Sequence, residues 1–304
     1  MNAQNKTRCG SCAILGVTNA GKSTLMNKLV GSKISIVSRK VQTTRCRLTG
    51  ILSDELSQII FVDTPGLFDA KRPLERAMID EIWRVLYDVD MILLLVDAEG
   101  SKSPPDFRPI AGILERRRSD QPILLALNKC DAVHPKEKLL DLAHAYNDHH
   151  PFAETLMISG RRGDGVEELL TAIRKYLPDG PFLYPDDQMM DIPLALMAAE
   201  MTREQIFDRL HQELPYQIMV ETTDFVDEED GSVTIRQNVI VSRDNHKGMV
   251  IGKGGTTLKQ IGARARHEIS QAFDQPVHLF LQVVVDEKWE QKAERLRRGG
   301  LLLG

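Results

Sequence analysis

The sequence of 304 residues has no long apolar run. Its longest aliphatic run, MILLLV at 91–96, has the length of a buried strand and is far short of the roughly 20 residues that span a bilayer. The N-terminal stretch MNAQNKTRCGSC lacks the apolar core of a secretion signal. We therefore expect a cytoplasmic protein, and its length allows two domains.

Cysteine is scarce, and neither sign of charge dominates. A structural zinc site needs two ligands besides Cys9 and Cys12, and no second closely spaced pair exists among the four cysteines. A redox pair would lie at a strand-to-helix turn, whereas we place this pair before the first strand, so reduced thiols are the better interpretation. With 39 basic and 43 acidic residues, any signal for nucleic-acid binding must be local.

Apolar runs alternate with amphipathic helical stretches through the first part of the chain, which predicts an α/β domain with a mostly parallel sheet and helices on both faces. The stretches 47–54 and 57–63 predict a hairpin that adds an antiparallel edge strand. The predicted buried strands are 13–17, 59–63, 91–97, 123–128 and 155–159.

A change in composition and in the order of predicted elements separates a second domain from the first. Residues 178–193 contain four prolines and are interpreted as a linker. A helix at 194–213, two strands, a short helix, a helix at 256–273 and a last strand follow, in the order αββααβ. The predicted division is a first domain at 1–177, the linker 178–193, a small α+β domain at 194–286 and a tail at 287–304.

The stretch GVTNAGKS at 16–23 matches GxxxxGK[ST] between a predicted strand and a predicted helix, the setting of a phosphate-binding P-loop. Its amides and the helix N-terminus favour phosphates, Lys22 supplies a positive charge, and Ser23 supplies a hydroxyl for Mg²⁺. The DTPG stretch at 63–66 ends another strand, so Asp63 can hold Mg²⁺ and the Gly66 amide can meet a γ-phosphate; the alternative is a plain Pro-Gly turn.

Two further strand ends complete a predicted guanine nucleotide site. The stretch NKCD at 128–131 ends one strand, and the carboxylate of Asp131 can accept guanine N1–H and N2–H₂, which adenine does not offer. Ser159 and Gly160 end the next strand, where a backbone N–H can meet guanine O6. The predicted nucleotide-binding residues are Gly16, Asn19, Ala20, Gly21, Lys22, Ser23, Thr24, Asp63, Gly66, Asn128, Lys129, Asp131, Ser159 and Gly160.

A second glycine-lysine loop, IGKGG at 251–255, has no Ser or Thr directly after its lysine and lies between two predicted helices. Helix, GxxG and helix are the elements with which a KH domain holds about four nucleotides of single-stranded nucleic acid. Residues 243–268 carry six basic and two acidic side chains, although 185–304 has a net charge of −6. The predicted apolar face of the second helix is Leu258, Ile261, Ala265, Ile269 and Ala272. The predicted RNA-binding residues are Arg243, Lys247, Gly252, Lys253, Gly254, Gly255, Lys259, Arg264 and Arg266.

In this order the motifs resemble those of the Era-type GTPases with a C-terminal KH domain, and the resemblance covers nearly the whole chain. It includes SIVSRKVQTTR, FVDTPGLF, REQIFDRLHQELPY and MVIGKGGTTLKQIGARAR. It implies Thr44, with Thr43 as the neighbouring alternative, as the third Mg²⁺ ligand beside Ser23 and Asp63. It further implies GTP/GDP and Mg²⁺ as ligands, and a monomer that binds the 3′ end of small-subunit ribosomal RNA, acts in small-subunit maturation and touches the membrane peripherally.

Position 67 departs from the Ras-like pattern, in which a glutamine orients the attacking water. Leu67 stands there and cannot hydrogen-bond. In the related group that shares this replacement, an asparagine of the P-loop helps to bind K⁺, and Asn19 occupies that position. The predicted catalytic residues are Lys22, Thr44, Gly66 and Asn19. A competing interpretation is a GTP-switched signalling or membrane-associated protein whose KH-like domain binds a protein.

Overall fold

The computed structural model describes residues 6–37, 48–68, 73–101, 105–210 and 214–292. The chain forms two compact units, of which the first comprises 1–35, 47–70 and 78–191 and the second comprises 36–46, 71–77 and 192–304. The predicted domain limits stay predictions. Within the described ranges, none of the helices combines the length and the apolarity that crossing a bilayer requires.

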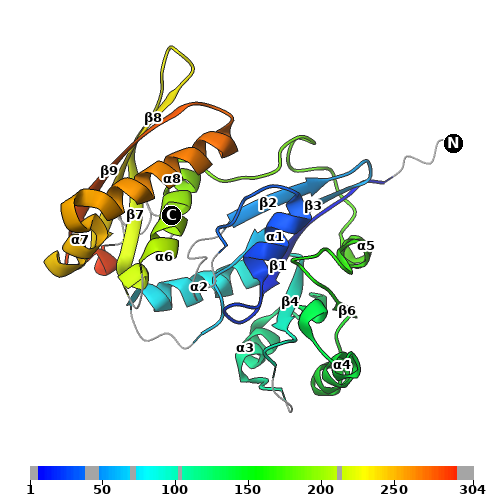
Figure 1. Cartoon of the computed structure of the whole chain (residues 1–304). Helices are drawn as coiled ribbons and strands as arrows, with labels where there is room; N and C mark the ends of the chain where they lie inside the picture. The colour runs from blue at the N-terminus through cyan, green and yellow to red at the C-terminus, as the bar shows by residue number, and fades with distance from the viewer. Residues whose placement is uncertain (1–5, 38–47, 69–72, 102–104, 211–213, 293–304) are drawn as a thin grey trace. The chain divides into compact units, whose positions relative to one another are not determined.

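The first unit contains a six-stranded sheet in the order β2-β3-β1-β4-β5-β6 (Figure 1). Only β2 runs antiparallel, on the edge beside β3, and the other neighbours are parallel. The predicted mostly parallel sheet is therefore confirmed, and so is its antiparallel hairpin. The strands are β1 (Arg8–Leu15), β2 (Leu48–Ser53), β3 (Ser57–Asp63), β4 (Met91–Asp97), β5 (Ile123–Asn128) and β6 (Glu154–Met157).

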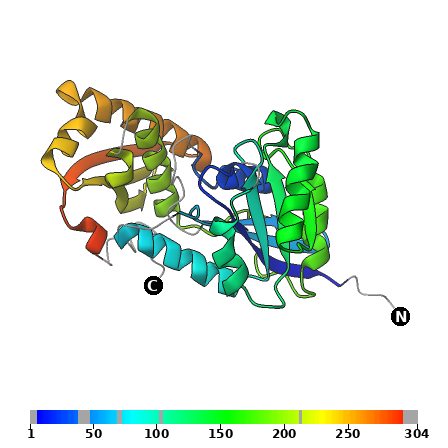
Figure 2. The same cartoon turned by 90° about the horizontal axis from the view of Figure 1, so that it is seen from below.

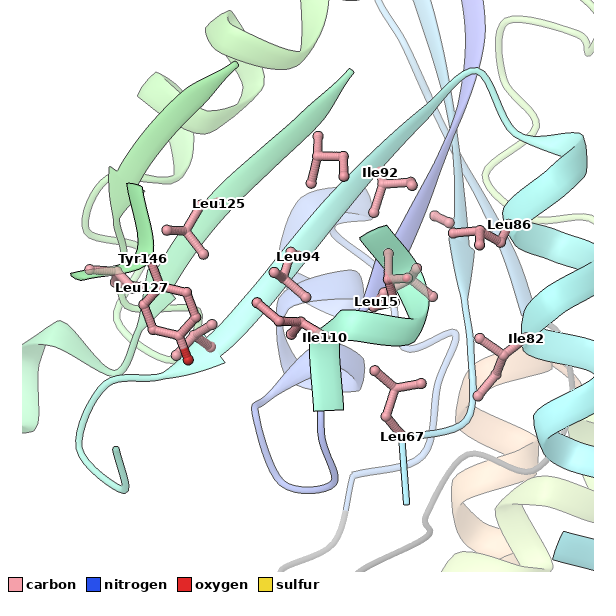
Figure 3. Close-up of a cluster of buried hydrophobic side chains, with 14 of the residues drawn as sticks. Leu15, Leu67, Ile82, Leu86, Ile92, Leu94, Ile110, Leu125, Leu127 and Tyr146 are labelled. Atoms are coloured by element: carbon pink, nitrogen blue, oxygen red, sulfur yellow. The ribbon is translucent and has the colours of Figure 1, made fainter. Parts of the chain in front are cut away.

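Helices cover both faces of this sheet, as Figure 1 and Figure 2 show. They are α1 (Lys22–Val30), α2 (Pro73–Asp88), α3 (Arg108–Arg116), α4 (Glu137–His149) and α5 (Val166–Tyr176). A continuous core of aliphatic side chains joins β1, β4 and β5 to α2, α3 and α4, and Ile92, Leu94 and Leu125 lie at its centre (Figure 3). Because β4 and β5 are buried on both faces, their sequences are apolar up to the last residue.

The first strand begins earlier than predicted. Cys9 and Cys12 lie inside β1 and not before it, because the strand continues to Arg8 through pairing with β3. Both thiols are buried and free, and burial raises the pKa of Cys12 to about 12. A buried, protonated thiol is a poor nucleophile and metal ligand, which agrees with a packing role.

The proline-rich stretch 178–193 is pinned to the sheet over most of its length. The Oε1 atom of Gln58, which is fully buried, accepts hydrogen bonds from the amides of Leu183 (2.8 Å) and Tyr184 (3.0 Å), and its Nε2 donates to the Tyr184 carbonyl (2.9 Å). Farther along, the backbone of 189–191 pairs with Thr49 and Ile51 of the edge strand β2. We call residues 183–191 the strap.

The second unit has the predicted order αββααβ. Its elements are α6 (Leu194–Arg209), β7 (Ile218–Asp227), β8 (Val233–Val241), α7 (Asp244–Ile251), α8 (Thr256–Phe273) and β9 (Val277–Val285). The central strand β8 pairs antiparallel with β7 and parallel with β9. The three helices pack against this sheet through one apolar core. The first helix ends at Arg209, earlier than the predicted 213.

The apolar face of α8 is shorter than predicted. Ile261, Ala265 and Ile269 are buried, and Leu258 packs against the core while staying half-buried. Ala272, expected on the same face, is exposed in the last turn of the helix.

Candidate functional site

The P-loop connects β1 to α1 and encloses the ammonium group of its own lysine. The Nζ atom of Lys22 donates hydrogen bonds of 3.1 Å to the carbonyls of Gly16 and Val17. Burial lowers the pKa of Lys22 to about 8, against the opposite effect of the nearby Asp63 carboxylate. A desolvated ammonium whose hydrogen bonds go to neutral carbonyl groups gains strongly from an arriving polyanion.

Asn128, at the end of β5, connects the P-loop to the loop after β6. Its Nδ2 donates to the Ala20 carbonyl (2.7 Å), and its Oδ1 accepts from the Gly160 amide (2.9 Å). Gly21 leaves the room for this side chain, because a Cβ there would lie 2.4 Å from Nδ2, and its φ of 95° also disfavours other residues. The structure thus brings three of the predicted nucleotide-binding segments together.

The predicted Mg²⁺ ligands Ser23 and Asp63 are in contact. The Ser23 hydroxyl donates a 3.0 Å hydrogen bond to Oδ2 of Asp63, whose side chain is buried. Hard oxygen donors of this kind suit Mg²⁺, which is usually held by one or two protein oxygens together with phosphates and water. The described residues contain no cluster of three His, Cys, Asp or Glu that would suit another metal. Thr43 and Thr44 lie outside the described residues.

The segment after β3 runs beside the P-loop. The backbone of Gly66 lies against Thr18, and the Leu67 amide donates to the Gly16 carbonyl (3.0 Å). The side chain of Leu67 turns into the apolar core, where it is 8% exposed and belongs to the same cluster as Leu15 and Ile82 (Figure 3). Position 67 is therefore a core position in this chain.

The NKCD segment carries two charged contacts. Lys129, in a left-handed conformation with φ of 63°, places its Nζ 2.5 Å from Oδ2 of Asp97 at the end of β4. A hydrogen bond from the Ser159 hydroxyl and the positive charge of Arg162, 3.3 Å away, lower the pKa of Asp131. Sequence reasoning missed Asp97 and Arg162, although Asp97 ends a buried strand as the predicted residues do.

The remaining predicted residues surround this centre. The amides of Ser159 and Gly160 donate to Asp164 and Asn128, so the predicted contact of this loop with guanine O6 stays a prediction. Asn19 is exposed at the tip of the P-loop with φ of 64°. Thr24 lies half-buried in the first turn of α1.

The second glycine loop forms a short turn of 3₁₀ helix, Lys253–Gly255, between α7 and α8. Gly252 is required there, because its φ is 74° and a Cβ would lie 2.1 Å from Oγ1 of Thr257. Lys253 is exposed. Helix, GxxG and helix therefore follow one another as predicted.

The predicted basic residues do not share one face of α8. Lys259 and Arg266 are seven residues apart and lie on the same side, whereas Arg264 points about 160° away from Arg266 at 100° per residue. All three are exposed, as is Arg243, and Lys247 is half-buried. Only part of the set can therefore face one strand of nucleic acid.

Comparison with known proteins gives matches over nearly the whole chain. The family described as "50S ribosome-binding GTPase" matches residues 11–129, and the KH domain family matches 213–290. The proteins called GTPase Era of Bradyrhizobium sp. (strain BTAi1) and Rhizobium meliloti (strain 1021) are each 49% identical to this chain, with 97% of it and 95% and 93% of their own lengths covered.

Two solved structures agree with this chain at a TM-score of 0.91 and 36% identity, covering 98% of it and all of the other chain. One is Era in complex with MgGDPNP and nucleotides 1506–1542 of 16S ribosomal RNA, and the other is an Aquifex aeolicus Era variant bound to GDP and AlF₄⁻.

The six-stranded sheet, the P-loop and the strand-end motifs define a P-loop GTPase, and the second unit adds a KH domain. The near-complete coverage by relatives at 49% identity is specific to one family of such proteins. The chain belongs to the GTPase Era family.

Proposed function

We propose that this chain binds GTP with Mg²⁺, hydrolyses it to GDP and phosphate, and binds single-stranded RNA through its KH domain in the assembly of the small ribosomal subunit. The observation that carries the enzymatic part is the enclosed ammonium of Lys22 beside the Ser23–Asp63 pair. Membership of the Era family supports the same activity.

Each part of the site has a separate task. Lys22 exchanges its bonds with loop carbonyls for bonds with the β- and γ-phosphates, and Asp131, held ionised by Ser159 and Arg162, accepts the two guanine N–H groups. Ser23, Asp63 and Thr44 would hold Mg²⁺, which neutralises charge on the phosphates when bound. The Gly66 amide would meet the γ-phosphate. Leu67, in the core, leaves the positioning of water to other groups.

The added proposal is that K⁺ supplies positive charge during hydrolysis, with Asn19 as one of its ligands. Its support is the exposed position of Asn19 at the tip of the P-loop and the apolar residue at 67. GTP turnover should be faster in K⁺ than in Na⁺, and Asn19→Ala should remove the difference while nucleotide affinity stays similar. Equal rates in both salts would contradict a role for K⁺.

Calorimetric titration tests the nucleotide site. Wild type should bind GDP and GTP and reject ATP, Lys22→Ala should weaken binding of both guanine nucleotides, and Asp131→Asn should lose the preference for guanine. Arg162→Ala removes a neighbouring charge without removing the carboxylate, so it should keep the preference. Equal affinities of the wild type for guanine and adenine nucleotides would contradict the proposed GTPase activity.

For the RNA we propose the 3′ end of 16S ribosomal RNA. The support is the structure of Era with nucleotides 1506–1542, whose chain corresponds to 98% of this one, and the GxxG loop beside exposed Lys253. The description of the matched GTPase family names the large subunit, but that match covers only 11–129. The structural match extends through the KH domain, and we therefore favour the small subunit.

The RNA test uses the full chain and a matched pair of glycine variants. Gly252 and Gly254 both have positive φ, but a Cβ would clash with Thr257 only at Gly252. Gly252→Ala should therefore weaken binding to a 16S 3′-end oligonucleotide more than Gly254→Ala does, and Lys253→Glu should weaken it at low salt above all. Failure of the wild type to bind any single-stranded RNA would favour the alternative, a KH-like domain that binds a protein. A cytoplasmic location, peripheral membrane contact and a monomeric state stay predictions.

A further inference from the structure

Ser35, the first residue of the SIVSRKVQTTR stretch and not among the predicted site residues, also contacts the proposed Mg²⁺ ligand Asp63. The hydroxyl of Ser35 donates a 2.9 Å hydrogen bond to Oδ2 of Asp63, the same oxygen that accepts from Ser23. Ser35 lies five residues after the end of α1 and is 1% exposed. A buried hydroxyl that donates its single proton to a carboxylate is committed to that partner.

Asn27 holds Ser35 in this position. Its Oδ1 accepts hydrogen bonds from the amides of Ile34 and Ser35 at 2.8 Å, and its Nδ2 donates to the Ser35 carbonyl at 2.7 Å. Asn27 follows Ser23 by four residues, so both project from the same side of α1. One face of this helix thus carries a direct contact with Asp63 and a second contact that runs through Ser35.

We propose that Ser35, held by Asn27, is a positioning residue of the Mg²⁺ site that raises the affinity of the nucleotide-bound protein for Mg²⁺. The proposal rests on the Mg²⁺-dependent nucleotide site proposed above. Two hydroxyl donors on one oxygen fix the rotation of the Asp63 carboxylate. Ser23 can turn its lone pairs to a metal while its proton stays on Asp63, whereas Ser35 acts through Asp63 alone.

Hydrogen-bond partners of metal ligands commonly contribute 10- to 100-fold to metal affinity. In the opposite role, the Ser35 hydroxyl would occupy Oδ2 of Asp63 and compete with the metal for that oxygen. The two roles predict opposite signs, because removal of the hydroxyl weakens Mg²⁺ binding in the first case and strengthens it in the second.

The test measures the release of a fluorescent GDP from the full-length protein over a range of Mg²⁺ concentrations. Ser35→Ala should raise the Mg²⁺ concentration that gives half-maximal retention about 10-fold. Its release rate in excess chelator should equal that of the wild type, because Ser35 does not touch the P-loop amides. Asn27→Ala should shift the Mg²⁺ requirement in the same direction, and Ser35→Thr, which keeps the hydroxyl, should restore it.

The matched control is Ser57→Ala. Ser57 makes a serine–aspartate hydrogen bond of 2.7 Å with Asp54 at the opposite end of β3 from Asp63. This variant should lose stability without any change in Mg²⁺ requirement. If the wild type depends on Mg²⁺ but Ser35→Ala needs the same or a lower Mg²⁺ concentration for half-maximal retention, the proposed role of Ser35 is wrong and the metal site itself still stands. A wild type that retains GDP equally without Mg²⁺ overturns the proposed metal site as well.

Discussion

The side-chain amide of Asn128 donates a 2.7 Å hydrogen bond to the carbonyl of Ala20, across 108 residues of sequence. The first residue of the NKCD motif is thereby hydrogen-bonded to the P-loop. Its Oδ1 accepts a hydrogen bond from the amide of Gly160 in the loop after β6. The nucleotide site is therefore ordered by contacts among its own motifs, so a change in one loop should affect the others.

This relationship predicts that Gly21→Ala strongly weakens nucleotide binding. A Cβ at Gly21 would lie 2.4 Å from Nδ2 of Asn128, so the side chain or the P-loop must move. Calorimetric titration with GDP should show an affinity loss of about 100-fold or more, equivalent to about 3 kcal/mol.

Gly31→Ala is the matched control, because Gly31 ends the same helix with a positive φ of 77° and has open space around its Cβ position. It should cost about 1–2 kcal/mol of stability from backbone strain alone and leave GDP affinity unchanged. Equal effects of the two variants on affinity would show that the contact with Asn128 does not matter.

The lowered pKa of Lys22 predicts a pH-dependent stability of the nucleotide-free protein. The pKa is about 8 in the folded protein and 10.5 ordinarily, so between these values the unfolded chain binds more protons and the free energy of unfolding rises with pH. Below pH 8 Lys22 is charged in the folded protein, so the full desolvation penalty of its buried ammonium lowers the free energy of unfolding. Lys22→Met should therefore gain stability relative to the wild type at neutral pH, by up to about 3 kcal/mol.

The advantage of Lys22→Met should shrink as the pH rises from about 8 toward 10.5, since the wild-type lysine is then neutral when folded. Urea denaturation of both proteins across that range measures the difference. Lys129→Met is a suitable control, because Lys129 is paired with Asp97 and partly exposed. A constant difference between the wild type and Lys22→Met would contradict the buried ammonium.

Replacing Leu67 by the glutamine of Ras-like enzymes should not create a faster enzyme. The side chain of residue 67 lies in the core, so a glutamine there buries an amide at a cost of about 1–3 kcal/mol. We expect Leu67→Gln to lower the melting temperature without raising kcat, and Leu67→Met to be tolerated. A higher kcat in Leu67→Gln would mean that this side chain can leave the core.

Gln58 should determine whether the strap stays on the sheet. Gln58→Leu leaves the amides of Leu183 and Tyr184 without their acceptor, and each of these partly buried hydrogen bonds is worth about 0.5–1.5 kcal/mol. Hydrogen exchange at these two amides should accelerate. Gln121→Leu removes another buried glutamine of the same unit, which donates to Leu86 and Val89, and should reduce stability without this local effect. Unchanged protection in Gln58→Leu would show that the strap is held by its pairing with β2.

Much of the architecture was predictable because it depends on patterns within short stretches. Apolar runs such as 91–96 identified the buried strands, and motifs at strand ends converge on one edge of a parallel sheet by geometry alone. The limits of elements were less accurate. Pairing with β3 draws Cys9 into β1, and α6 ends at Arg209, because pairing and packing with distant residues decide where an element stops.

The sequence by itself determined the fold class, the identity of the nucleotide-binding motifs and the helix-GxxG-helix of the KH domain, since each depends on residue types at fixed spacing. Only the tertiary structure decided that Leu67 is a core residue, that Gln58 holds the strap, and that Ser35 shares Asp63 with Ser23. These relationships join residues 28 to 125 positions apart or depend on which way a side chain turns, and no local pattern encodes either. The contact between Ser35 and Asp63 therefore became visible only in the folded chain.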